Sequence, residues 1–247
     1  MNSTIEVLTN RFSVRAYLDK PISDEHQDVI NEVIYRSPTA GNMQDFSVIV
    51  VDDQNLKEKL SKLCDNQPFI TKAPLLYIFV SDFTRYKDYF ELCEVDENDF
   101  STPHYGTMMN GIIDATIAAQ SASVAANSLG IGTCYIGDII ENKEQITDLL
   151  GLNSNMIPVA MLTCGYYKQE VKLSPKIDKK YIFHSNKYTR ASSDEVKDIF
   201  SSKKIPKKYQ DQYSNFGEYY YATKVGADFS QEMDRSMRLY IDNFKQQ

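Results

Sequence analysis

The spacing of apolar and polar residues predicts helices and strands that alternate along most of the chain. After Ser23, Asp24 and Glu25, apolar side chains recur at the spacing of a capped amphipathic helix that ends near Arg36. Short runs rich in β-branched residues predict strands at 46–52, 75–80 and 157–164, and 133–136 looks like the end of another. Further helices are expected at about 54–63, 107–129, 141–150 and 230–244. This alternation indicates an α/β or an α+β protein.

Two of these segments have an unusual composition. The run 75–80 is nearly all apolar, which predicts a strand that is buried on both faces. The helix at 107–129 is rich in alanine, so that another helix or a cofactor can approach its backbone closely, although a plain central helix would have the same composition. Polar residues within it, Asn110, Asp114, Gln120 and Asn127, would be costly in lipid and favour a buried helix over a membrane span.

The remaining segments read as surface structure. Residues 86–107 are acidic and aromatic and are expected to form an excursion over the surface. Residues 168–209 are rich in lysine and in loop-forming residues. There are no repeats and no long linker, so we expect a single domain over 1–247, with a body at 1–165 and a C-terminal arm and helix at 166–247.

Charge and cysteine content exclude several classes of protein. The net charge of −7 argues against nucleic acid or an anionic membrane as the main partner. The first ten residues lack the cationic start and apolar run of a signal peptide, so a cytoplasmic location is expected. The four cysteines show no CxxC spacing and the three histidines are scattered, which predicts reduced thiols and no metal site.

One short motif carries candidate binding chemistry. Arg11, Ser13 and Arg15 occupy alternating positions, so their side chains share one side of an extended segment. Two guanidinium groups and a hydroxyl on one side suit a phosphate and the polar edge of a ring. Taken alone, such a triplet is more often a solvated surface.

The motif is the first of an ordered set. It is followed by Pro21-Ile22-Ser23, by the loop 37–44 with the sequence SPTAGNMQ, and by the turn 130–137 with the sequence GIGTCYIG. In order and spacing the set resembles the nitroreductase family, and within it the NADPH-preferring major oxygen-insensitive nitroreductases and flavin reductases. The resemblance runs from about Ile5 to Tyr188 and extends more loosely to the C-terminus.

This resemblance implies a three-layer α+β fold and a cofactor. A central, mostly antiparallel sheet would be flanked by helices, with the C-terminal arm extending over the partner of a homodimer. FMN would bind at the subunit interface, with NADPH or NADH as co-substrate. No catalytic side chain is implied, since the N5 atom of the flavin would face the backbone of Gly137 and Asp138.

The resemblance also assigns roles to individual residues. Arg11 and Ser13 would hold the FMN phosphate, with Lys176 as a further cation, and Arg15 would reach the N1/O2 edge of the ring, where it would favour the reduced anion. Gln67 would bind the N3/O4 edge. The remaining implied contacts come from the loop over the ring and from the segment alongside it: Thr39, Asn42, Gln44, Tyr135, Ile136, Gly137 and Asp138.

Three positions depart from the pattern of that group. Asp138 stands where the group usually has a second glycine, and Ser174 replaces one of two cations in the arm. Lys224 is the only cation in the segment that would bind the 2′-phosphate of NADPH, and Asp228 opposes it.

Three functions are compatible with the sequence. The favoured one is an FMN-dependent NAD(P)H oxidoreductase that transfers hydride in ping-pong fashion to nitroaromatic, quinone or flavin acceptors. A flavin-binding or storage protein of the same fold would carry the same phosphate motif. The third is an α/β interaction protein without flavin. The sequence does not identify the physiological acceptor.

Overall fold

A four-stranded antiparallel sheet forms the centre of the protein in a computed structural model that describes residues 2–96, 105–168 and 173–245. Its strands lie in the order β1-β2-β4-β3, with every neighbouring pair antiparallel and a bulge at Phe79/Val80. The strands are β1 (Phe46–Val51), β2 (Leu75–Asp82), β3 (Gly132–Ile136) and β4 (Met156–Gly165). The strands expected from sequence are confirmed, and the antiparallel pairing makes the fold α+β.

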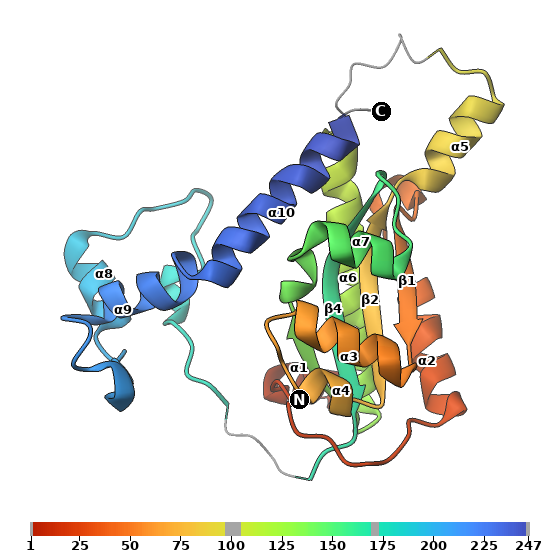
Figure 1. Ribbon diagram of the computed structural model, residues 1–247. Helices are drawn as coiled ribbons and strands as arrows, with labels where there is room; N and C mark the ends of the chain where they lie inside the picture. The colour runs from red at the N-terminus through yellow and green to blue at the C-terminus, as the bar shows by residue number, and fades with distance from the viewer. Residues whose placement is uncertain (1, 97–104, 169–172, 246–247) are drawn as a thin grey trace. The chain divides into compact units, whose positions relative to one another are not determined.

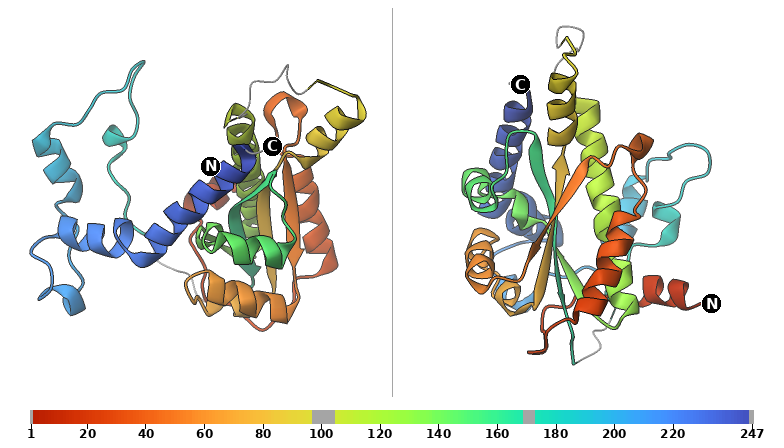
Figure 2. Two further views of the ribbon diagram at one scale, coloured as in Figure 1. Left: turned by 45° about the horizontal axis from the view of Figure 1, so that its top comes forward. Right: turned by 90° about the vertical axis from the view of Figure 1, so that its right-hand side faces the viewer.

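Helices cover both faces of this sheet and give a three-layer arrangement (Figures 1 and 2). One face packs against α2 (Asp24–Tyr35) and the alanine-rich α6 (Tyr105–Ser128). The other face packs against α3 (Gln54–Leu63), α4 (Phe69–Lys72) and α7 (Lys143–Leu150). Every residue of β2 is buried between the layers, as its apolar run predicts.

Three helices of eight or more residues within the described ranges were not expected from the sequence. In α1 (Ser3–Asn10), the Asn2 side chain accepts from the Ile5 amide. In α5 (Thr84–Leu92), the rings of Phe83, Tyr86 and Phe90 pack on one another at helical spacing.

The first part of the surface excursion expected at 86–107 is therefore helical, and none of the residues of α5 is buried. Part of that excursion, 97–104, lies outside the described residues. The third unexpected helix, α8 (Ser193–Phe200), begins with a capping box of Ser192 and Glu195, a sequence signal that the lysine-rich surroundings hid.

The chain divides into two compact units. The first unit comprises Met1–Lys172 and Glu232–Gln247, and the second comprises Leu173–Gln231. The second unit contains α8, α9 (Phe216–Tyr220) and η6 (Tyr221–Val225), and clusters the rings of Tyr209, Tyr213, Phe216 and Tyr219. The last helix, α10 (Asp228–Lys245), buries Tyr240 and Phe244 in a cluster with Met108 and Ile157 of the first unit.

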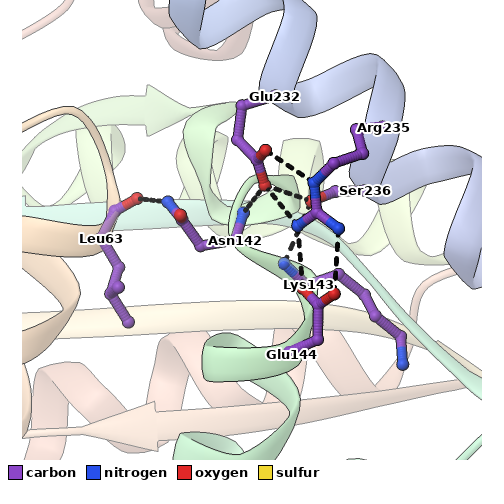
Figure 3. Close-up of polar contacts among 7 residues, drawn as sticks. All are labelled: Leu63, Asn142, Lys143, Glu144, Glu232, Arg235 and Ser236. Carbon is purple, nitrogen blue, oxygen red and sulfur yellow. Dashed lines mark hydrogen bonds and ion pairs between the residues drawn. The ribbon is translucent and has the colours of Figure 1, made fainter.

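An arginine of α10 joins this helix to the start of α7. The guanidinium of Arg235 donates to both carboxylate oxygens of Glu144, at 2.9 and 2.8 Å, and its Nε donates to Glu232 at 2.8 Å (Figure 3). The hydrogen bond with Arg235 is the main reason that the pKa of Glu144 falls to about 2. This bidentate geometry suits arginine and not lysine.

The same helix also holds the turn before α7. The Asn142 amide donates to Glu232 Oε1 at 3.1 Å, and the Lys143 amide donates to Ser236 Oγ at 3.0 Å (Figure 3). Asn142 adopts a left-handed conformation with φ of 51°, and its side chain donates to the Leu63 carbonyl at 2.8 Å. The amides at the N-terminus of α7, which have no partner within the helix, are thereby satisfied from outside it.

We expect Arg235→Ala to lower the free energy of unfolding, because Arg235 ties α10 to α7 through Glu144 as well as pairing with Glu232. Arg238→Ala is the matched control, because Arg238 pairs with Asp234 on its own helix and its loss should cost less. Since the pKa of Glu144 is lowered in the folded state, the contribution is present above the ordinary glutamate pKa and is lost as pH falls toward about 2. Chemical denaturation of both variants at several pH values measures this, and equal losses for the two would contradict it.

Candidate active site

The segment that carries Arg11, Ser13 and Arg15 runs along the free edge of β3. The Val14 amide donates to the Thr133 carbonyl at 2.9 Å, and Ser13 forms a parallel bridge with Thr133. Val14 is buried, and a Cβ at Gly132 would lie 2.4 Å from its Cγ2 atom. The glycine therefore permits the close approach that keeps this segment extended against the sheet.

The three polar side chains of the segment all influence the pKa of one buried thiol. Burial raises the pKa of the Cys134 thiol, whereas Arg15, a hydrogen bond with Ser13, and Arg11 act in the opposite direction. Their common influence on this thiol fits the alternation expected from sequence. Because burial prevails and keeps the thiol protonated, Cys134 packs as a core residue, with no sign of a reactive thiolate.

Arg11 is the least satisfied cation of this group. Its Nε and Nη2 atoms are buried and have no hydrogen-bond partner among the described residues. Its guanidinium carbon lies 5.8 Å from the ring centroid of Tyr135, whose hydroxyl donates to Gln120 at 3.1 Å. Buried donors without acceptors are costly, so this guanidinium is suited to an anionic group such as a phosphate.

A second group of predicted residues lies at the other end of β3. Gln67 donates to the Asp138 carboxylate at 2.8 Å, which joins the loop before α4 to the turn after β3. Ile136 is buried, whereas Gly137 is exposed, and a Cβ at Gly137 would meet no atom within 4 Å. The backbone at Gly137 is therefore open to a flat ligand.

The loop residues Thr39, Asn42 and Gln44 lie elsewhere in the chain's fold. They precede β1, at the opposite edge of the sheet from β3. The Gln44 amide donates to Thr39 Oγ1 at 3.2 Å, and Arg85 donates to the Gln44 carbonyl at 2.6 Å. Asn42 and Gln44 both have a φ of 58°, so this loop has a tightly specified conformation. Within one chain the structure does not bring these residues to Arg11, Ser13 and Arg15.

Lys176 and Lys224 belong to the second unit and are exposed there. The Lys224 ammonium lies 5.7 Å from the ring centroid of Phe229. Their predicted contacts with phosphate and with the nicotinamide cofactor stay predictions.

The structure adds one buried acid that sequence reasoning missed. Glu141 is 3% exposed, and its pKa rises to about 8, first through burial and then through a hydrogen bond with Asp138. The sequence signal for this acid was the spacing of Asp138 and Glu141, which lie three positions apart in the turn after β3. No group of three or more metal-ligating side chains occurs among the residues that the structure describes.

Comparison with known proteins identifies the family. The family model described as Nitroreductase family matches residues 8–166, well over half of the chain. The chain belongs to the nitroreductase family.

Individual relatives agree with this assignment. An NAD(P)H FMN reductase of Bacillus subtilis is 34% identical over 191 residues, which cover 76% of this chain and 75% of the relative. An oxygen-insensitive NADPH nitroreductase of Salmonella typhimurium is 29% identical over 188 residues, with coverage of 76% and 75%. The solved structure of Bacillus megaterium NfrA2 has a TM-score of 0.83 and 28% identity, and the match covers 99% of this chain and 98% of that one. The resemblance and the nitroreductase-like α+β fold are both confirmed, whereas the C-terminal arm over a partner subunit stays a prediction. No helix within the described ranges is long and apolar enough to cross a membrane.

Proposed function

We propose that this nitroreductase-family chain is an FMN-dependent NAD(P)H oxidoreductase. One observation carries the proposal, namely the buried, unpartnered guanidinium atoms of Arg11 beside Ser13 and Arg15. They fit a phosphate group in position and in charge. The names of the Bacillus subtilis and Salmonella typhimurium relatives, an FMN reductase and an NADPH nitroreductase, support the same activity.

The residues of the chain bind and orient the cofactor. Arg11 and Ser13 hold the phosphate, with Lys176 as an added cation, and Arg15 supplies positive charge at the N1/O2 edge of the ring. Gln67 binds the N3/O4 edge, and the segment from Tyr135 to Asp138 lines the ring beside the open backbone at Gly137.

The chemistry resides in the cofactor. Bound FMN would supply the chemistry of ping-pong hydride transfer from NADPH or NADH to a nitroaromatic, a quinone or a free flavin. The protein would orient the ring and fix the charge distribution around it, so it needs no nucleophile or acid of its own. An open site in which acceptors only stack on the ring would accommodate several acceptor classes.

The two separated groups of residues support a site built from two chains. The register of the sheet puts Gln44 and Ser13 roughly 20 Å apart along the strands and about 14 Å or more across them. One ring and its phosphate tail do not satisfy both groups in a single chain. In our proposal the partner of a homodimer supplies Thr39, Asn42 and Gln44.

Exposed apolar side chains favour the same assembly. Met109 and Ile113 on α6 are 51% and 47% exposed, and Val29 and Val33 on α2 are exposed as well. Apolar side chains that recur on neighbouring helices are typical of a protein–protein interface.

We expect Arg11→Ala to weaken FMN binding about tenfold or more, because a charge-assisted hydrogen bond contributes ~1.5–3 kcal/mol. Fluorescence titration of the flavin-free protein measures the dissociation constant. Arg36→Ala is the control, since Arg36 pairs with Glu32 on the surface of α2. A wild-type dissociation constant for Arg11→Ala would remove Arg11 from the site.

The holoprotein should sediment at roughly twice the chain mass of 28.3 kDa at low micromolar concentration. Ile113→Glu, which puts a charge on the exposed apolar face of α6, should yield monomers that also lose FMN. A wild-type monomer with full flavin occupancy would refute the two-chain site.

Anaerobic addition of NADPH or NADH should bleach the yellow holoprotein, which distinguishes a turnover enzyme from a flavin store. A single exposed lysine at the 2′-phosphate contributes ~1 kcal/mol, so NADPH should be preferred by only about fivefold. Lys224→Ala should reduce that preference, read as the ratio of kcat/KM values, while leaving NADH turnover unchanged. A strong preference that survives the substitution would assign the 2′-phosphate to other cations, such as the lysines at 203–208.

A further inference from the structure

The side-chain amide of Gln67 has both of its hydrogens engaged within the protein. Nε2 donates to the Cys64 carbonyl at 3.0 Å and to the Asp138 carboxylate at 2.8 Å. A carbonyl and a carboxylate only accept, so the NH2 group must face them and the amide cannot be flipped. Oε1 accepts no hydrogen bond from any described residue. The side chain of Gln67 can therefore bind a ligand only by accepting a hydrogen bond at Oε1.

The backbone of Gln67 is fixed as well. Its amide donates to the Ser61 carbonyl at 3.1 Å, and its carbonyl accepts from the Ser61 hydroxyl at 2.7 Å and from the Ile70 amide at 3.1 Å. With the main chain and the NH2 group both held, Oε1 has a defined direction. This arrangement is a preorganised acceptor, because little conformational freedom remains to be lost on binding.

Asp138 is in turn held by Glu141. The Glu141 side chain is buried, forms a hydrogen bond with Asp138, and leaves Oε1 without a partner among the described residues. Other acidic groups face it, Asp65 from the loop after α3 and Glu232 from α10, and these raise its pKa further. The neighbouring Cys64 thiol also has a raised pKa, chiefly through burial, which favours its neutral form. Burial, the hydrogen bond with Asp138 and the acidic neighbours all favour the protonated form of Glu141.

We propose that the Asp138–Glu141 pair locks Gln67 as a hydrogen-bond acceptor, so that this site selects a ligand edge that offers an N–H donor. The inference rests on the function proposed above, under which that donor is the N3–H of FMN. Asp138 and Glu141 are positioning residues in this scheme and act through Gln67. A second glycine at position 138 would leave one amide hydrogen of Gln67 without its acceptor and the amide free to turn.

The test compares binding of FMN and of N3-methyl-FMN, which lacks the donor, to the flavin-free protein. The steric cost of the methyl group is common to all variants, so the informative quantity is the ratio of the two dissociation constants. In the wild type, the dissociation constant of N3-methyl-FMN should exceed that of FMN. Asp138→Ala should reduce this ratio by roughly fivefold, which corresponds to the contribution of about one hydrogen bond. Asp138→Asn is the matched control, because its amide oxygen still accepts from Gln67 and should retain the ratio.

The outcomes separate this inference from the proposed function. If Asp138→Ala distinguished FMN from N3-methyl-FMN as well as the wild type does, Asp138 would not fix the orientation of Gln67, although FMN binding would still support the proposed function. A wild-type protein that binds no FMN would overturn the proposed function and the ligand assignment with it.

A second measurement needs no flavin. A glutamate whose pKa rises from 4.5 to about 8 on folding stabilises the fold below the lower value, and this contribution is lost as pH rises toward the higher one. Glu141→Gln, which keeps a donor for Asp138, should therefore flatten the fall in unfolding free energy across this range. If the wild type and Glu141→Gln showed the same pH dependence, the role of Glu141 in the Asp138–Glu141 pair would be overturned.

Discussion

The approach of the chain at Val14 to the edge of β3 is the constraint on which the candidate site depends. A single amide-to-carbonyl hydrogen bond and one parallel bridge add residues 11–15 to the sheet. The contact is close enough that only glycine fits at position 132. Arg11 and Arg15 lie in the same short segment as Val14. The sheet therefore sets their positions, and its buried core holds them rigidly.

Much of this arrangement was predictable from the sequence, and the exceptions have physical causes. The strands and α2 follow from apolar spacing and a serine cap, and the alternation of Arg11, Ser13 and Arg15 follows from extended geometry. Single-sequence patterns do not reveal which distant segments meet, so the contact between Gln67 and Asp138 across 71 positions was not foreseen. Glu141 was missed for the same reason, because its raised pKa depends on burial, which several separate elements create.

Errors in secondary structure came from composition overriding spacing. The acidic and aromatic composition of the segment containing α5 predicts only a surface excursion, whereas Phe83, Tyr86 and Phe90 satisfy a helical repeat. For α8, lysines and loop-forming residues obscured a capping box. In both cases a local physical signal was present, and weighting it above average composition would have found the helix.

The separation of the loop 39–44 from the arginines has a thermodynamic consequence if the site is shared by two chains. Ligand binding and subunit association then draw on one free-energy cycle, and each must strengthen the other by the same factor. Flavin affinity would rise with protein concentration, and a cell short of flavin would hold more dissociated chains with apolar helix faces open to water. Cofactor supply would in that way set the lifetime of the polypeptide as well as its activity.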